Sequence, residues 1–231
     1  MLKLSVAFVL ASLAVPALAQ AVLIDSPQTP KTMSVAFVLT DGATMIDFAG
    51  PWEVFQDVMI PQPGKPMSMD DHIMPFELFT VGASREPIRT SGGMTVVPDH
   101  TFADAPHADI VVVGAQRGGP GLKEYLQKAR TQSKTVMSVC TGAFKLADAG
   151  LLAGKQATTH HDFFDAFAKR YPDVKLARDQ RFVQADPVVF SAGGLTSGID
   201  LALHVVELYY GREAAERTAT YMEYTGTRWR D

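Results

Sequence analysis

An uninterrupted β-branched run, Ile110 to Val113, sets the first limit on the fold. A strand without polar alternation is typical of a parallel sheet that helices cover on both faces. Similar apolar strand patterns and amphipathic helix patterns alternate along the chain, with strands expected at 33–39, 76–81 and 134–137 and helices at 122–132 and 198–210. This alternation predicts an α/β fold, a three-layer sandwich with a mostly parallel central sheet.

The first nineteen residues have the pattern of an export signal. Lys3 precedes an apolar run from Leu4 to Val15, and Ala17-Leu18-Ala19 is an A-x-A cleavage site. We therefore expect a cleaved signal peptide at 1–19, a spacer at 20–32 and a single domain at 33–231. The run is too short to span a bilayer comfortably. The alternatives are an uncleaved anchor and a first strand after a misassigned start.

Charge and cysteine content narrow the function classes. The 231 residues carry a formal charge of −4 with no basic block, which argues against nucleic acid as a partner. Export predicts a periplasmic or secreted protein in an oxidising compartment, with no membrane contact after cleavage. The chain has one cysteine, Cys140, so an internal disulfide is excluded. This cysteine is buried and inert, paired between chains, or a reactive thiol.

Cys140 lies where a predicted strand (134–137) turns at once into a helix. Such a turn lifts a side chain above the carboxyl edge of a sheet, beside the free N–H groups of a helix N-terminus. Both effects favour the nucleophilic thiolate over the thiol. The competing interpretation is a small buried hydrophobic residue.

Asp47 is the first candidate for an acid or base. It follows the first predicted strand, and Gly50-Pro51 predicts the start of the next helix. Asp47 either caps that helix or places a carboxyl group above the sheet edge, where it shares a proton with the sulfur. Glu53 is the second candidate acid.

Ligands of parallel sheets bind beyond the carboxyl ends of the strands. We expect four segments to meet there, namely Asp47, Gly114 to Gln116, Cys140 and Gly193 to Thr196. The Gly-rich loop at 116–121 lacks the lysine and hydroxyl residue of a P-loop, so no nucleotide or other cofactor is expected.

Five motifs in order resemble the ThiJ/PfpI superfamily, whose fold is flavodoxin-like and of the class I glutamine amidotransferase type. They are Asp47-Phe48-Ala49-Gly50-Pro51, Ser138-Val139-Cys140-Thr141-Gly142, Ala149 to Lys155, Ala157-Thr158-Thr159-His160 and Gly193 to Asp200. The resemblance spans Met33 to about Tyr224. Within the superfamily, the chain most resembles isonitrile hydratases and the sensor domains of AraC-type regulators.

The resemblance implies Cys140 as nucleophile, Asp47 as its acid/base partner and Thr141 as a hydroxyl neighbour, with Leu195 packed near the sulfur. It also implies a homodimer and a small electrophilic substrate. For an isonitrile, the thiolate attacks the carbon, Asp47 helps to deliver the proton, and water releases an N-formamide. We expect substrate contacts from Gly114, Ala115, Gln116, Gly194, Leu195 and His160, with backbone N–H groups near Ala115 and Thr141 stabilising developing charge.

Two departures from the family pattern affect the substrate. The family's proteases carry His directly after the nucleophile, and Thr141 stands there, which argues against a Cys-His peptidase. The usual Pro-Gly-Gly reads Gly114-Ala115-Gln116, so the Gln116 side chain and the Cβ of Ala115 are expected to reshape the pocket.

His160 is either a catalytic base or a hydrogen-bonded structural residue. As a metal site, adjacent His160 and His161 with Asp162 are weak candidates because neighbouring side chains generally diverge, and no metal is expected.

Three function classes remain open. The chain is a thiol-dependent hydratase or hydrolase, a binding domain that keeps the fold without catalysis, or a redox protein whose Cys140 is modified. AraC-type sensors carry a DNA-binding pair of helices after this domain, and we expect no such pair in this chain.

Overall fold

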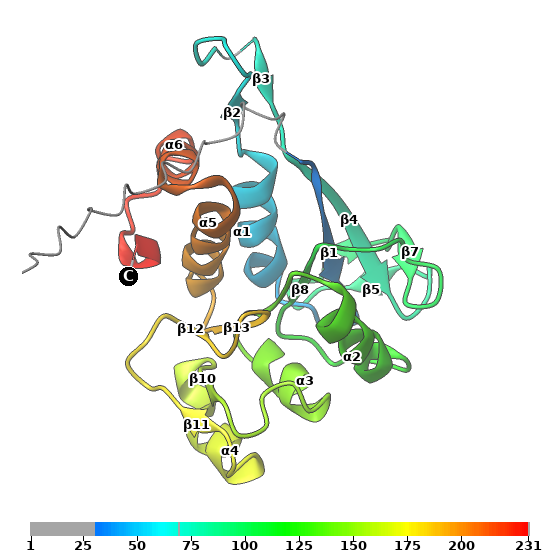
Figure 1. Cartoon of the computed structure of the whole chain (residues 1–231). Coiled ribbons are helices and arrows are strands. Elements are labelled where there is room, and N and C mark those ends of the chain that lie inside the picture. The colour runs from blue at the N-terminus through cyan, green and yellow to red at the C-terminus, as the bar shows by residue number, and fades with distance from the viewer. Residues whose placement is uncertain (1–30, 69, 231) are drawn as a thin grey trace, which may run out of the picture.

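The structure, a computed structural model, describes residues 31–68 and 70–230. A central sheet lies between two layers of helices (Figure 1), which confirms the predicted three-layer α/β sandwich. The predicted signal peptide and nearly all of the spacer lie outside the described residues. Within these residues, no helix has both the length and the apolar character needed to cross a membrane.

The main sheet has seven strands in the order β12-β13-β9-β8-β1-β4-β7, and every pairing is parallel except β12 with β13. The strands are β1 (Met33–Val38), β4 (Phe76–Gly82), β7 (His100–Thr101), β8 (Ile110–Val113), β9 (Thr135–Ser138), β12 (Phe182–Gln184) and β13 (Val189–Ala192). Val113 pairs with Val38 on one side and with Ser138 on the other. Three central strands therefore end at the same level, and the chain leaves them along one edge.

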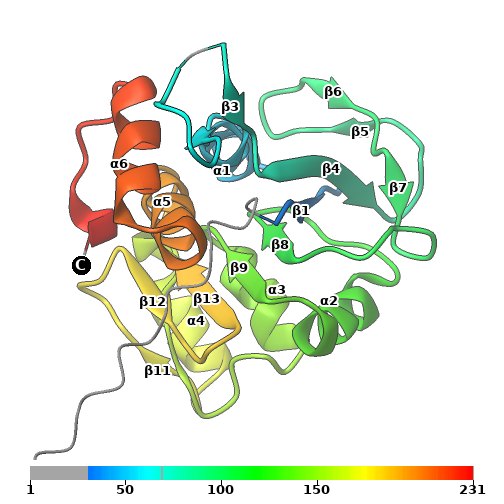
Figure 2. The same cartoon turned by 45° about the horizontal axis from the view of Figure 1, so that its top comes forward.

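Helices cover both faces of this sheet (Figure 2). One layer contains α1 (Met45–Gln56), α5 (Ser197–Tyr210) and α6 (Arg212–Tyr221), and the other contains α2 (Leu122–Gln132), α3 (Gly142–Asp148) and α4 (Phe164–Arg170). Val35 and Phe37 pack into the first core and Ala36 and Val38 into the second. Because successive strand residues face opposite layers, both cores require apolar residues, which explains the uninterrupted apolar runs.

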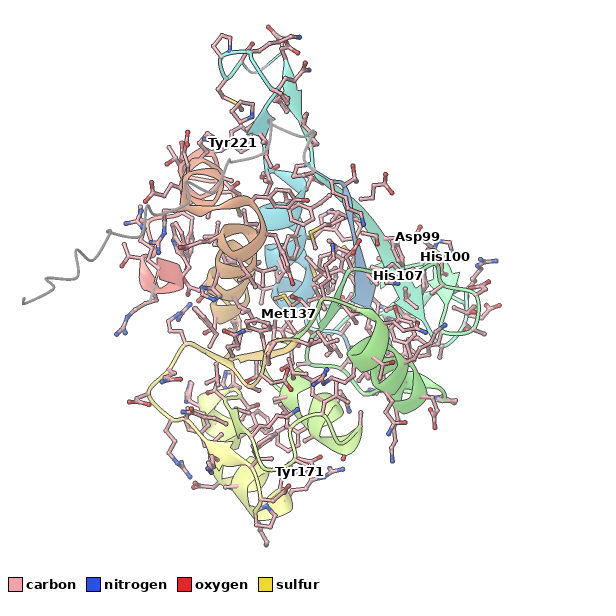
Figure 3. The ribbon with its side chains drawn as sticks, in the orientation of Figure 1. Asp99, His100, His107, Met137, Tyr171 and Tyr221 are labelled. Carbon is pink, nitrogen blue, oxygen red and sulfur yellow. The ribbon has the colours of Figure 1, made fainter. Side chains whose placement is uncertain are left out.

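Side chains of the first core fill the middle of the molecule. Figure 3 shows Met137 of β9 in this interior, where it is fully buried, and Tyr221 at the end of α6, where it is exposed. Asp99 and His100 lie together at the β7 edge in the same view. There Asp99 Oδ2 accepts hydrogen bonds from the N–H (2.8 Å) and the hydroxyl (2.7 Å) of Thr80.

Short elements complete the chain. Two antiparallel hairpins are formed by β2 (Ile60–Pro61) with β3 (His72–Ile73) and by β5 (Ile88–Arg89) with β6 (Thr95–Val96). A short parallel pair is formed by β10 (Gln156–Ala157) and β11 (Lys175–Leu176). There are also two 3₁₀ turns, η1 (His161–Phe163) and η2 (Arg228–Arg230). In Figure 1 the β2–β3 hairpin projects away from the three layers.

The expected start of the first helix at Gly50-Pro51 is wrong. The helix α1 begins at Met45 after the N-cap Thr44, and Pro51 lies inside it. Proline at this point removes its own N–H from the helix ladder and crowds the carbonyl of residue 47. Burial of Val54 and Phe55 in the core offsets this cost and holds the helix. Asp47 is therefore in the first turn of α1, and it is not the N-cap.

Candidate active site

The backbone of Cys140 adopts a conformation that L-residues rarely take. It lies between β9 and α3 with φ = 58°, in the left-handed region, which costs a non-glycine residue on the order of 1–3 kcal/mol. Its N–H donates to the Gly193 carbonyl (2.9 Å), and its carbonyl accepts from the Thr159 hydroxyl (2.9 Å). Hydrogen bonds on both sides hold the sulfur at the carboxyl edge of the sheet.

Two glycines let the surrounding elements approach closely. A Cβ built on Gly142 would lie 2.1 Å from the Val113 carbonyl oxygen, so only glycine lets α3 start against β8. A Cβ built on Gly114 would lie 2.7 Å from the Cβ of Asp47. The absence of a side chain at Gly114 thus allows α1 to bring Asp47 to the end of β8.

Asp47 is completely buried. Its Oδ2 accepts a hydrogen bond from the Ala115 N–H (2.9 Å). Its Oδ1 has no conventional hydrogen-bond partner among the described residues. Glu53, the other candidate acid, lies on the exposed face of α1 and accepts a hydrogen bond from Gln56 (3.2 Å). Of the two candidates, Asp47 is the one that reaches the sulfur.

The Cys140 sulfur interacts with three groups. The backbone N–H groups of Thr141 and Leu195 donate to it, and the Asp47 carboxyl group interacts with it both as a charge and as a hydrogen-bond partner. Leu195 has a positive φ of 53°, like Cys140 itself. The structure thus brings together Cys140, Asp47, Thr141 and Leu195, as expected from the resemblance.

The thiolate preference expected at Cys140 is wrong. Burial, followed by the negative charge of Asp47, raises the pKa of Cys140 to about 11, against the lowering effect of the Thr141 and Leu195 N–H groups. Burial also raises the pKa of Asp47 to about 6, although the Ala115 N–H and Cys140 lower it. Desolvation outweighs the N-terminus of the seven-residue helix α3. At neutral pH the pair therefore keeps its proton on sulfur and its charge on Asp47.

The residues after β8 form hydrogen bonds within the fold. The Ala115 N–H donates to Asp47, so the donors at the sulfur are Thr141 and Leu195.

The Gln116 side chain accepts from the N–H (2.6 Å) and hydroxyl (2.9 Å) of Thr40 and donates to the Val38 carbonyl (3.0 Å). Gln116 thus ties β8 to β1 through its side chain.

The loop that carries the Leu195 N–H is held by Arg181, which precedes β12. The Arg181 carbonyl accepts from the Gly193 N–H (2.8 Å), and its guanidinium donates to the Thr196 hydroxyl (3.1 Å). These contacts lie on either side of Leu195. Arg181 therefore fixes the position of one of the two N–H groups that face the sulfur.

A buried carboxylate anchors Arg181 in turn. Asp200 of α5 is 1% exposed and accepts from Arg181 Nε (2.5 Å) and from the Tyr224 hydroxyl (3.0 Å). Sequence reasoning placed Asp200 within a family motif and gave Arg181 and Tyr224 no role. The only sequence signal for this role was that Asp200 is an acid on an otherwise apolar helix face. A carboxylate in such a position is expected to be buried, and a buried carboxylate requires partners.

His160 lies beside Gly194 and caps η1. A Cβ on Gly194 would lie 2.2 Å from His160 Cδ2, so the ring packs on the glycine. His160 Nδ1 accepts from the Asp162 N–H (3.2 Å), which places the proton of the neutral ring on Nε2. The expectation that His160 and His161 diverge is wrong, because their rings stack at 4.5 Å. The ligand atoms of both and of Asp162 lie within 4.8 Å of one another.

An open cavity of about 390 Å³ adjoins the thiol site. Its walls include Thr159, Gly193 and Leu195, each of which hydrogen-bonds to Cys140. Gly194, His160 and Arg181 line it as well. Leu195, which is 43% exposed, lines this cavity and also supplies one of the N–H groups that face the sulfur. The cavity has room for a small molecule beside the loop that carries Leu195, but neither Cys140 nor Asp47 lines it.

Comparison with known proteins shows the family of this chain. The model of the DJ-1/PfpI family matches residues 33–208. The chain belongs to the DJ-1/PfpI family. This match contains β1, Asp47, Cys140 and nearly all of α5, so every segment of the candidate site except Tyr224 lies inside it.

Members of different function classes are similar to this chain. An isonitrile hydratase from Pseudomonas putida is 29% identical over 198 residues, covering 83% of this chain and 78% of the relative. The HTH-type transcriptional regulator GbdR from Pseudomonas aeruginosa is 28% identical, and the match covers 81% of this chain but only 49% of that regulator. The crystal structure of a ThiJ/PfpI family protein from Pseudomonas syringae superposes with a TM-score of 0.68 at 24% identity, over 86% of this chain and 77% of the other. The last likeness supports the fold alone.

Proposed function

We propose that the protein is an exported thiol-dependent enzyme of the isonitrile hydratase type, with Cys140 as nucleophile and Asp47 as proton carrier. The main support for the proposal is the pair formed by Cys140 and Asp47. The buried Asp47 carboxyl group faces the Cys140 sulfur, and its Oδ1 is free of conventional partners among the described residues. Similarity to the isonitrile hydratase supports the choice of substrate class.

The reaction uses one proton that moves between the two side chains. As the sulfur bonds to the isonitrile carbon, the thiol proton passes to the Asp47 carboxylate, which then delivers it to the same carbon. This gives a thioimidate on Cys140. Water adds to its carbon, the carbon–sulfur bond breaks, the thiol is restored and an N-formamide leaves. Isonitrile and water are the only compounds consumed.

The pKa values fit this division of roles. A thiol whose pKa is about 11 needs a base at neutral pH, and a carboxyl group with a pKa of about 6 is mostly ionised yet close to neutrality. The Thr141 and Leu195 N–H groups stabilise negative charge as it develops on the sulfur. Asp47 therefore acts first as a general base and then as a general acid.

Turnover of a small panel of alkyl and aryl isonitriles, followed as N-formamide by chromatography, tests the proposal. Wild type and Glu53→Gln should form product, while Cys140→Ser and Asp47→Asn should lose at least about 100-fold in kcat, the usual size of a general acid–base contribution. Glu53 is an exposed carboxylate on the same helix and controls for charge removal. Folded wild type without turnover of any isonitrile, or Asp47→Asn with full activity, would overturn it.

A second candidate is a binding or redox-sensing domain without turnover. The high pKa of Cys140, about 11, favours it because such a thiol is a poor nucleophile unless its proton is removed. The similarity to a transcriptional regulator is consistent with it. Saturable isonitrile or small-molecule binding that raises the melting temperature without product, and that persists in Cys140→Ser, would favour this function over catalysis.

A further inference from the structure

A second open cavity, of about 610 Å³, lies at the same edge of the sheet on the β1–β4 side. It is formed by the Asp41–Gly42 turn after β1, the β5–β6 hairpin from Pro87 to Gly93, and Arg117 from the loop after β8. We call it the arginine cavity because Arg89 and Arg117 both line it. Its volume is in the range of small-molecule sites.

The two guanidinium groups are largely unused by the protein. Arg117 makes no side-chain hydrogen bond or ion pair with any residue of the described part of the chain, and its stem lies over Gly42. A Cβ built on Gly42 would be 3.4 Å from Arg117 Cγ. Arg89 gives one hydrogen bond, to the Gly93 carbonyl (3.2 Å), and no ion pair within the same residues. Two arginines from distant segments thus line one cavity with most of their donors free.

The nearby acid does not neutralise them. Asp41 is the one carboxylate among the cavity's described lining residues, and its Oδ1 accepts from the backbone N–H of Arg89 (3.0 Å). It forms no ion pair with either guanidinium within the described chain. Lys145 is a further cation next to Arg117, since its Nζ donates to the Arg117 carbonyl (3.0 Å). In a chain of net charge −4 this is a local excess of positive charge.

Backbone hydrogen bonds fix the frame of the cavity. The Gly42 N–H donates to the Arg89 carbonyl (2.7 Å), the Ser91 N–H to the Ala43 carbonyl (3.0 Å) and the Arg117 N–H to the Asp41 carbonyl (3.0 Å). The hairpin, the turn and the loop are therefore joined into one unit. A binding site whose backbone is already ordered loses less conformational entropy when a ligand binds.

We propose that the arginine cavity binds a small anion through Arg89 and Arg117, with a carboxylate or phosphate group as the recognised chemistry. The planar guanidinium fork matches the paired oxygens of these groups, and charge-assisted hydrogen bonds are the stronger kind. The site is independent of the thiol reaction. It adjoins the segment that leads into α1, where the Thr44 N–H donates to the Ala115 carbonyl (2.9 Å), but neither Cys140 nor Asp47 lines it.

Calorimetric titration of the whole protein with inorganic phosphate and, separately, with succinate tests the site. Binding of either probe should weaken at least about tenfold in Arg117→Gln and in Arg89→Gln, as expected for the loss of a charge-assisted hydrogen bond. Arg117→Lys keeps the positive charge but lacks the planar guanidinium fork, so its affinity should lie between those of wild type and Arg117→Gln. Added sodium chloride should weaken binding as well. Phosphate binding alone identifies a phosphate ligand, and succinate binding alone a carboxylate.

Two controls separate this site from general charge effects. Arg85→Gln removes an exposed arginine that pairs with Asp104 (2.9 Å) near the same hairpin and should leave the affinity unchanged. Cys140→Ser should also leave it unchanged, because the thiol is outside the cavity. Absence of binding of both probes to wild type, or equal weakening in Arg85→Gln and Arg117→Gln variants of unchanged melting temperature, would overturn the assignment.

Discussion

The Nε atom of Arg181 lies 2.5 Å from Oδ2 of the buried Asp200. This ion pair is far from the sulfur in sequence, but it fixes the Gly193–Thr196 loop, whose Leu195 N–H faces Cys140. A contact between the start of β12 and the first turn of α5 thus determines how one donor meets the thiol.

Arg181→Met should destabilise the protein and raise the pKa of Cys140 further. It leaves the Asp200 carboxylate with only the Tyr224 hydroxyl as partner, and removing one member of a fully buried pair costs about 3–5 kcal/mol. Because Arg181 is 36% exposed, we expect roughly 2 kcal/mol in a urea unfolding curve. Loss of the Leu195 donor should also slow thiol alkylation at a fixed pH.

Arg178→Met is the matched control for this variant. Arg178 pairs with Asp165 (2.7 Å), whose side chain is 93% exposed. An exposed pair of this kind contributes at most about 1 kcal/mol, and it does not contact the loop. If the two variants lose the same stability and react equally fast, Arg181 does not have the positioning role.

The rate of Cys140 alkylation should depend on pH in a way that reports Asp47. With the pKa of Cys140 raised to about 11, the wild-type rate should keep increasing above pH 9 without reaching a plateau. Asp47→Asn removes the negative charge that raises this pKa, so the profile should shift to lower pH. Glu53→Gln should not shift it. A wild-type plateau below pH 8 would contradict the assignment.

Protein stability should also change with the ionisation of Asp47. Burial raises its pKa from 3.8 to about 6, so the folded state holds this proton more tightly than the unfolded state. The contribution of protonated Asp47 to the free energy of unfolding is therefore fully present below about pH 4 and is lost as pH rises through about 6. Relative to Asp47→Asn, wild type should therefore lose roughly 2 kcal/mol of unfolding free energy between pH 4 and 7. A difference that stays constant over this range would exclude a raised pKa.

Much of the fold could be predicted because it depends on patterns that are local in the sequence. Uninterrupted apolar runs marked β1 and β8, and amphipathic spacing gave α2 its observed ends, Leu122 and Gln132. The start of α1 was missed because proline is common in a first turn, whereas here core packing of the helix keeps Pro51 in its interior.

The site itself was predictable only in part. Strand ends and motifs brought Cys140 and Asp47 together, but the pKa of the thiol depends on burial, which no local pattern measures. The role of Arg181 was missed for a related reason. Its partner Asp200 lies 19 residues away, and Tyr224, the other donor to Asp200, lies 43 residues away. Only the folded chain shows that the carboxylate is buried.

Gly142→Ala tests whether close packing of α3 on β8 positions the thiol. The new Cβ would lie 2.1 Å from the Val113 carbonyl oxygen and 3.0 Å from that of Gly114. Backbone atoms cannot move aside as a side chain can, so α3 must shift, at a cost of about 3 kcal/mol or more. Gly119→Ala is the control, because its nearest neighbour would be the Ala83 Cβ at 3.5 Å, an ordinary contact. Thermal unfolding should separate the two variants by roughly 6–12 °C. Equal melting temperatures would mean that α3 does not depend on glycine at this position.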